Sequence, residues 1–207
     1  MKILFIGVSS FTGFHFVKKI SKNKSLKIYC TLTKNFRDYT SEKKVRLNLI
    51  RKIKNIKIIE NTEFGDKNFI KILKKTYFDI LCFHYAHTEN YNDDKKFNFK
   101  KSLDKNLNNI KDVFLVLNKN QKIIITNTIF QHIKSKRYSA VNNYGKSKTK
   151  TYEILKKYCI KKRIKFKSFF ITNPWGIFEE KKLNYHLIKN WFKNKVPVVK
   201  YPKYIRD

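Results

Sequence analysis

Short apolar runs alternate with longer stretches of helical period along most of this chain. Six runs have the length of a strand and are rich in Ile, Phe or Tyr, namely residues 2–7, 26–32, 55–60, 79–86, 122–127 and 165–171. The stretches between them space their apolar residues as one face of a helix does, for example at 11–23, 66–75, 103–119 and 142–163. Because strand and helix alternate, and several strands are almost continuously apolar, we predict an α/β fold whose parallel sheet is covered by helices on both faces.

The pattern changes from residue 173 onward. A loop at 173–176 is followed by an amphipathic stretch at 184–194, which predicts a helix, and by a short predicted strand at 196–201. A globular chain seldom ends on such a segment. We therefore expect one domain at 1–172 and, at 173–207, the beginning of a smaller second region that is only partly present.

The chain is strongly basic, with 48 Lys and Arg against 15 Asp and Glu and a formal net charge of +33. Such a charge would suit nucleic acid or an anionic membrane. However, lysines spread along the whole chain supply most of it, and only six basic residues are arginines, which read bases and phosphates with paired hydrogen bonds. This pattern is typical of an A+T-rich coding bias acting on a solvated surface. We expect no nucleic-acid partner and no membrane, and tight binding with a steep salt dependence would indicate the alternative.

The cysteines and the N-terminus indicate the compartment. Cys30, Cys82 and Cys159 are widely separated and form no C-x-x-C pair, which is typical of free thiols in a reducing environment. The N-terminal apolar run spans only six residues after Lys2, too few for a signal peptide or a membrane span. We therefore expect a cytoplasmic protein.

Four polar residues receive a structural interpretation. His84, His87 and His132 do not have metal-ligand spacing, so we predict core or loop positions for them and no metal site. Asp66 precedes a helical stretch and is predicted to cap its N-terminus.

Residues 7–13, Gly-Val-Ser-Ser-Phe-Thr-Gly, follow the first strand and open the first helix. Their outer glycines have the spacing of a dinucleotide-binding turn, in which free backbone N–H groups face a pyrophosphate. A serine stands where the middle glycine would be, so its Cβ should crowd the phosphate, although its hydroxyl could donate to it. We expect a Rossmann-like, doubly wound dinucleotide-binding domain. Its turn would hold the cofactor through Gly7, Ser10, Phe11, Thr12 and Gly13. A glycine-containing turn without a ligand is the alternative.

The end of the second strand bears on the choice between NAD and NADP. An acidic residue would normally follow this strand and hold the ribose of NAD. This chain has Thr33, Lys34 and Arg37 instead, and a hydroxyl with two cations suits a 2′-phosphate. We predict NADP or NAD as the cofactor, with NADP modestly favoured, while surface charge remains the alternative interpretation of the lysine.

Tyr144 and Lys148 stand four residues apart in a helical stretch and therefore lie on one face of it. An unperturbed tyrosine has a pKa of about 10 and is a poor base at neutral pH. A lysine ammonium one turn away would lower that pKa and make the tyrosine a catalytic acid or base. In a chain this rich in lysine, a plain solvated helix is the alternative.

Six motifs of this chain occur in the same order as in one known superfamily of enzymes. The stretches Gly7–Gly13, Asp79–Ala86, Asp104–Ile110, Ile123–Thr128, Tyr144–Lys148 and Thr172–Gly176 resemble, in order and separation, those of the extended short-chain dehydrogenase/reductase superfamily, the sugar-nucleotide epimerases and dehydratases. Together they cover nearly the whole chain.

The resemblance implies a role for each matching residue. Tyr144 and Lys148 match the Tyr-x-x-x-Lys signature, and Lys148 would also reach a ribose hydroxyl of the cofactor. Thr128 would bind the substrate oxygen, with Thr126 as the fallback. The remaining matches are Asn106 in a proton relay, Tyr85 and Ala86 beside the cofactor, and Asn173 near the substrate's diphosphate.

The function that follows is an NAD(P)-dependent epimerase, dehydratase or reductase acting on a nucleotide-activated sugar. The resemblance makes the nucleotide sugar the partner and allows a homodimer. Because Ser10 departs from the glycine pattern, a non-catalytic NAD(P)-binding regulatory module is the alternative. The sequence does not determine which sugar or which of the three reactions.

Overall fold

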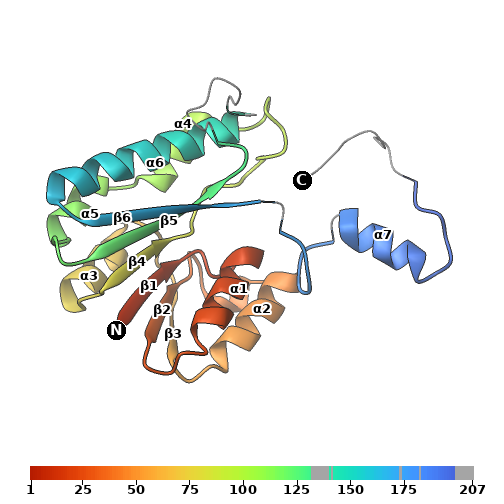
Figure 1. Cartoon of the computed structure of the whole chain (residues 1–207), viewed down its shortest axis with the longest axis horizontal. Helices are drawn as coiled ribbons and strands as arrows, with labels where there is room; N and C mark the ends of the chain where they lie inside the picture. The colour runs from red at the N-terminus through yellow and green to blue at the C-terminus, as the bar shows by residue number, and fades with distance from the viewer. Residues whose placement is uncertain (132–139, 141, 173, 182, 199–207) are drawn as a thin grey trace.

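A computed structural model describes residues 1–131, 140, 142–172, 174–181 and 183–198 (Figure 1). Six parallel strands form one sheet in the order β3-β2-β1-β4-β5-β6. Their bounds are β1 Lys2–Ile6, β2 Lys27–Thr31, β3 Ile56–Ile59, β4 Ile80–Phe83, β5 Lys122–Thr128 and β6 Lys165–Ile171. Each strand lies within one of the six predicted runs or extends it by one residue, and the order is that of a doubly wound dinucleotide-binding sheet. The predicted fold class is confirmed.

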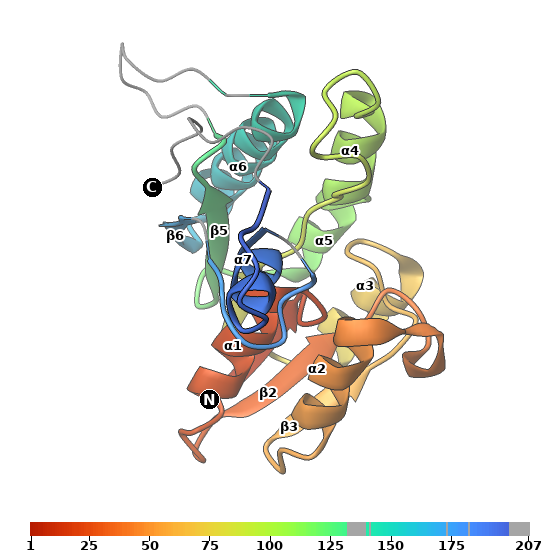
Figure 2. The same cartoon turned by 90° about the vertical axis from the view of Figure 1, so that its right-hand side faces the viewer.

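The helices that cover the sheet lie in two layers. Their bounds are α1 Phe11–Ile20, α2 Ser41–Arg51, α3 Lys67–Lys75, α4 Phe99–Asn106, α5 Ile110–Val116, α6 Asn143–Lys162 and α7 Leu183–Trp191, with a short 3₁₀ helix, η1, at Phe36–Asp38. Helices α1 and α2 lie on one side of the sheet, and α4, α5 and α6 lie on the other (Figures 1 and 2).

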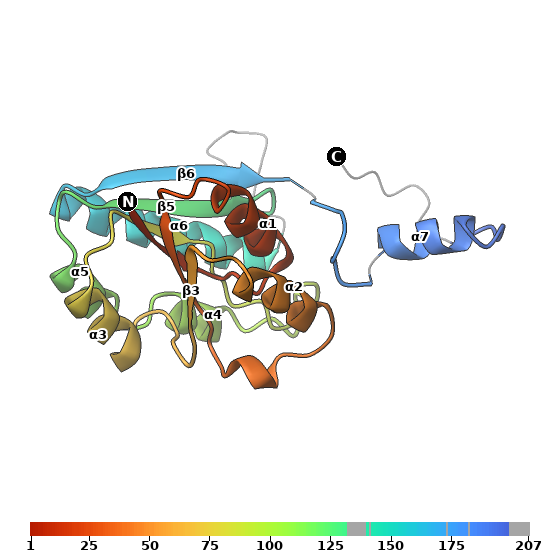
Figure 3. The same cartoon turned by 90° about the horizontal axis from the view of Figure 1, so that it is seen from below.

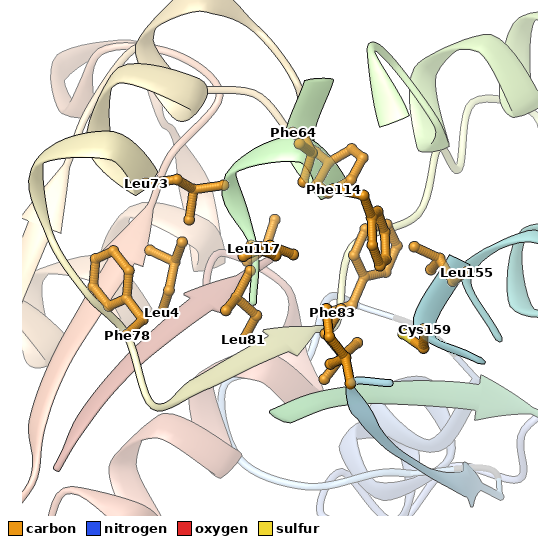
Figure 4. Packing of buried hydrophobic residues seen from close by; sticks show 14 of the residues in the cluster. Leu4, Phe64, Leu73, Phe78, Leu81, Phe83, Phe114, Leu117, Leu155 and Cys159 are labelled. Carbon is orange, nitrogen blue, oxygen red and sulfur yellow. The ribbon is translucent and has the colours of Figure 1, made fainter. Parts of the chain in front are cut away.

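Alternation along β1 divides the core into two clusters. Leu4 and Ile6 belong to the cluster that also contains residues of α3, α5 and α6, and Figure 4 shows Leu4 beside Phe78 and Leu73 in it. The intervening residues, Ile3 and Phe5, join the cluster beneath α1 and α2. A strand places successive side chains on opposite faces, so a continuously apolar strand serves both cores.

The strand register positions the site. Ile6 of β1 lies opposite Thr31 of β2 and Phe83 of β4, so these three strands end in line. Strand β5 pairs with β4 up to Ile125 and then continues to Thr128. The end of β5 therefore extends beyond its neighbour at the carboxyl edge of the sheet, where ligands bind in doubly wound folds.

Strand β6 departs from the prediction of a sheet covered on both faces. It forms the edge of the sheet (Figure 3), and Phe169 and Phe170 are 40% and 47% exposed. Phe16 of α1 contacts Phe169, with the ring centroids 5.5 Å apart. Over the described residues, the helices therefore cover the centre of the sheet and leave most of β6 open.

One helical prediction needs correction, a second is confirmed, and one strand prediction is wrong over the described residues. The stretch 103–119 is two helices, because α4 ends at Asn106 and Asn109, left-handed with φ 44° at the N-cap of α5, interrupts the helical backbone before Ile110. The stretch 184–194 does form α7, which stands apart from the sheet (Figure 3) and buries none of its residues. Residues 196–198 form no strand, and the rest of the predicted 196–201 strand lies outside the described residues.

None of the helices in the described part of the chain combines the length and the apolar character needed to cross a bilayer.

Candidate active site

The turn between β1 and α1 is built around the Ser10 side chain. Its hydroxyl donates to the Gly7 carbonyl at 2.9 Å and accepts from the Gly13 N–H at 3.0 Å, which makes Ser10 the N-cap of α1. The Gly13 N–H is therefore used within the turn, and the N–H groups of Phe11 and Thr12 remain without an intrahelical partner. An anion at this turn would meet those two donors and the positive end of α1.

Both outer glycines of the turn are required by close backbone approach. Gly7 has φ +101°, and a Cβ there would lie 2.8 Å from the His84 carbonyl oxygen. A Cβ on Gly13 would lie 2.3 Å from the Gly7 carbonyl oxygen. This compact turn with open donors fits a dinucleotide pyrophosphate, so the residues present are compatible with the predicted cofactor.

The three residues predicted to determine the preference for NADP over NAD are exposed to solvent just after β2. Thr33, Lys34 and Arg37 are all exposed. The Thr33 hydroxyl is 3.3 Å from the Tyr39 hydroxyl, and the Lys34 ammonium lies over the Tyr39 ring, 5.0 Å from its centroid. These contacts leave the cations accessible to a ligand.

Tyr144, in the first turn of α6, packs in an aromatic cluster. Its ring centroid lies 5.6 Å from that of Tyr91 and 6.0 Å from that of Phe97. Burial, and then the neighbouring Tyr91, raise the pKa of Tyr144 to about 12. This shift is opposite to the one expected from the sequence, because the phenol lies in a desolvated aromatic setting and Lys148 makes no hydrogen bond to it in the described part of the chain.

Lys148 is 4% exposed and its ammonium donates to the Thr126 carbonyl at 2.8 Å. Burial lowers the pKa of Lys148 to about 8, since desolvation disfavours the charged form. The lysine is thus fixed to the end of β5, one helical turn from Tyr144.

Thr128 and Thr126 use their hydroxyls differently. Thr128 Oγ1 accepts weakly from the Phe130 N–H at 3.4 Å, so it contributes to the turn that follows β5. The Thr126 hydroxyl instead lies 2.8 Å from Nδ1 of His84. Both residues are at the extended end of β5, and Thr126 makes the stronger connection to the surrounding groups.

Asn106 is buried at the end of α4 and joins two other elements. Its Oδ1 accepts from the His87 N–H at 2.8 Å and its amide nitrogen donates to Thr151 of α6 at 3.2 Å. Asn106 therefore fixes the segment after β4, which contains Tyr85 and Ala86, against α6. Burial and Glu63 raise the pKa of Tyr85 to about 12, so its phenol stays neutral.

Asn173, the predicted substrate contact, lies outside the described residues. Within the described ranges, no group of three or more His, Cys, Asp or Glu side chains could hold a metal ion.

The structures similar to this chain give the fold a family context. No protein-family model matches the chain, and no curated protein matches it. UDP-glucuronic acid 4-epimerase from Bacillus cereus, in complex with UDP-glucuronic acid and NAD, superposes with a TM-score of 0.72 at 17% identity, over 94% of this chain and 64% of its own. dTDP-glucose 4,6-dehydratase from Bacillus anthracis, in complex with NAD, gives 0.69 at 16% identity, over 94% and 62%. UDP-glucose 4-epimerase from Thermotoga maritima, with UDP-glucose, gives 0.73 at 15% identity, over 100% and 68%.

The fold of this chain is therefore similar to that of NAD-dependent sugar-nucleotide epimerases and dehydratases. The expected structural resemblance to the extended short-chain dehydrogenase/reductase superfamily is confirmed, and the chain spans about 64% of the length of the Bacillus cereus epimerase. The neighbours named as cofactor complexes contain NAD, so they give no support to the predicted preference for NADP.

Two residues near the turn were not predicted from the sequence to contribute to the site. His84 contacts both the turn and β5, although the sequence suggested only a core or loop histidine. Arg46 of α2 is 0% exposed and donates to the Ser9 carbonyl at 2.9 Å and to Glu180 at 2.7 Å. The available signal was the rarity of arginine, because a lysine-rich chain that retains an arginine indicates a position where the forked guanidinium is needed.

Proposed function

We propose that this chain binds NAD or NADP at the turn 7–13 and acts on a nucleotide-activated sugar, as an epimerase, dehydratase or reductase. The observation that carries the proposal is a set of contacts at one edge of the sheet. His84 joins Thr12 of the turn to Thr126 of β5, and Lys148 is bonded to the Thr126 carbonyl. Hydrogen bonds thus connect the turn 7–13, the end of β5 and Lys148 in one site.

The cofactor, when bound, exchanges hydride with the reacting carbon of the sugar. The protein has to supply or remove the proton at the oxygen bonded to that carbon. Tyr144, with its raised pKa, holds its proton at neutral pH and is suited to donate it when a carbonyl is reduced. Thr128 would bind the same oxygen, and the Lys148 ammonium would stabilise the phenolate that remains.

The remaining residues would hold the ligands. Gly7, Ser10, Phe11, Thr12 and Gly13 would surround the pyrophosphate, with Tyr85 and Ala86 beside the ring system. Thr33, Lys34 and Arg37 would approach the adenosine ribose, with or without a 2′-phosphate. The substrate class is supported by the neighbours, two of which are complexes with UDP-sugars.

A non-catalytic NAD(P)-binding module is the second candidate function. Two observations favour it: Ser10 already occupies the Gly13 N–H, and Tyr144 is enclosed by Tyr91 and Phe97. Under this alternative the chain would bind the dinucleotide and leave the sugar unchanged.

Conversion of nucleotide sugars tests the proposal against this alternative. The protein is incubated with NAD and, separately, with UDP-glucose, UDP-glucuronic acid and dTDP-glucose, and the sugar is followed by proton NMR. We expect an inverted sugar carbon, loss of water or a keto sugar from at least one substrate. Three unchanged substrates, with NAD shown to bind, would favour the non-catalytic module.

A further inference from the structure

His84 occupies a position between the two halves of the site. It directly follows β4, and its ring lies between the turn after β1 and the end of β5. Nε2 is 2.8 Å from the Thr12 hydroxyl and 3.1 Å from the Ser10 hydroxyl, while Nδ1 is 2.8 Å from the Thr126 hydroxyl. One ring therefore contacts the turn through one nitrogen and the end of β5 through the other.

The hydrogen-bond partners assign the protonation of the ring. The Ser10 hydroxyl gives its single proton to the Gly7 carbonyl, so toward His84 it acts as an acceptor. Nε2 must then carry a proton, which it shares between Ser10 and Thr12. A neutral imidazole has its lone pair on the other nitrogen, so Nδ1 accepts from the Thr126 hydroxyl.

The surroundings keep this ring neutral. Phe5 and Phe16 lie against it, with centroids 5.7 Å and 5.5 Å away, and the Lys148 ammonium is nearby. Burial first, and Lys148 second, lower the pKa of His84 to about 3. The donor at Nε2 and the acceptor at Nδ1 are thus constant across the physiological pH range.

We propose that His84 is a positioning residue that couples the cofactor turn to the β5 strand end on which Lys148 is anchored. The coupling runs from Thr12 and Ser10 through the imidazole to the Thr126 hydroxyl, and from the Thr126 carbonyl to the Lys148 ammonium. The ring fixes the distance between the turn 7–13, where the dinucleotide would bind, and Lys148. This inference rests on the proposed function, since it assigns a task within the same site.

A double-mutant cycle with NADH affinity as the readout tests the coupling. His84→Phe keeps a ring among Phe5 and Phe16 but removes both hydrogen-bonding nitrogens, and we expect roughly tenfold weaker NADH binding. Thr126→Val removes the partner on β5, on the far side of the ring from the turn, and should weaken NADH binding about threefold. The double variant should bind as His84→Phe does, within about twofold, because Thr126 acts through the ring.

Two further variants separate positioning from a general loss of packing. His84→Gln carries an amide that can donate where Nε2 does, so it should recover most of the NADH affinity that His84→Phe loses. Thr76→Val, at the C-cap of α3 away from the site, removes a threonine hydroxyl and should leave the affinity unchanged. If His84→Phe does not fold, His84→Leu, which also lacks both ring nitrogens, takes its place in the cycle with Thr126→Val.

The outcomes are distinct from those of the proposed function. Wild-type protein that binds neither NADH nor NADPH would overturn both proposals, and if it binds only NADPH the cycle is measured with that dinucleotide. Wild-type protein that binds, with His84→Phe binding equally well or with the two losses multiplying in the double variant, would overturn only the coupling. Weaker binding that Thr126→Val no longer affects in the His84→Phe background would support it.

Discussion

A Tyr144→Phe variant is expected to lose sugar-nucleotide turnover by roughly 10²–10⁴-fold while binding NADH as the wild-type chain does. The loss follows from removing the only group on this residue that can transfer a proton, which is the usual magnitude for a positioned acid or base. Cofactor affinity should be kept, because the Phe ring preserves the packing against Tyr91 and Phe97. Turnover is measured by NMR on whichever nucleotide sugar the wild type converts.

Tyr91→Phe provides the matched control for that variant. It removes the neighbouring hydroxyl and keeps the ring, so turnover should fall by less than about threefold if Tyr144 alone moves the proton. Because Tyr91 contributes to raising the pKa of Tyr144, its removal should also shift the alkaline limit of activity to lower pH. Full turnover in Tyr144→Phe would exclude Tyr144 as the proton donor.

An Arg46→Met variant is expected to lose about 2–4 kcal/mol of the free energy of unfolding. Arg46 is fully buried and its guanidinium donates to the carbonyls of Ser9 and Phe178, at 2.9 Å and 2.5 Å, and pairs with Glu180 at 2.7 Å. Methionine fills a similar volume but leaves both carbonyls without this donor. Urea unfolding followed by circular dichroism gives the difference.

Two variants calibrate this loss. Arg51→Met, on the exposed side of the same helix, removes a guanidinium that stacks on Phe36 and should cost less than about 1 kcal/mol. Arg46→Lys keeps the charge but not the fork, so its stability should fall between those of Arg46→Met and the wild type. Wild-type stability in Arg46→Met would contradict an anchoring role for this arginine between the phosphate turn and the segment at 174–181.

The strands could be predicted because the sequence pattern that marks each one lies within a single short run of residues. Runs such as 122–127 are apolar and β-branched, and burial on both faces leaves them no helical alternative. The helix start at Asp66 was also predictable, because an N-cap side chain accepts from the backbone N–H three residues further along the chain and needs no distant partner. The structure confirms that cap, with the Phe69 N–H donating to Asp66 Oδ1 at 2.6 Å.

The site was predictable in its location and less so in its contacts. Ser10 was interpreted against the glycine pattern of a cofactor turn, yet its hydroxyl caps α1, as a serine before a helix commonly does. The pKa of Tyr144 depends on Tyr91 and Phe97, which reach it from a loop some fifty residues earlier in the sequence. No spacing rule along one helix reveals such a neighbour.

Arg46 and His84 show why long-range contacts resist sequence reasoning. Arg46 meets Glu180 across 134 residues, and His84 meets Ser10 across 74. Their partners become neighbours only when the sheet order brings β1 beside β4 and the segment after β6 back onto α1 and α2. The rarity of arginine and histidine in the sequence indicated that these positions could matter. Their hydrogen-bond partners could be identified only from the folded structure.

Titration of the wild-type chain with NADH and with NADPH tests the central claim that residues 7–13 form a dinucleotide site. Isothermal titration calorimetry at physiological salt should give saturable one-to-one binding for at least one of the two, and comparison of the affinities decides between them. The Arg51→Met protein, altered away from the turn, should bind with the wild-type affinity. Absence of saturable binding to either dinucleotide at millimolar concentration, in protein shown to be folded by circular dichroism, would contradict the account.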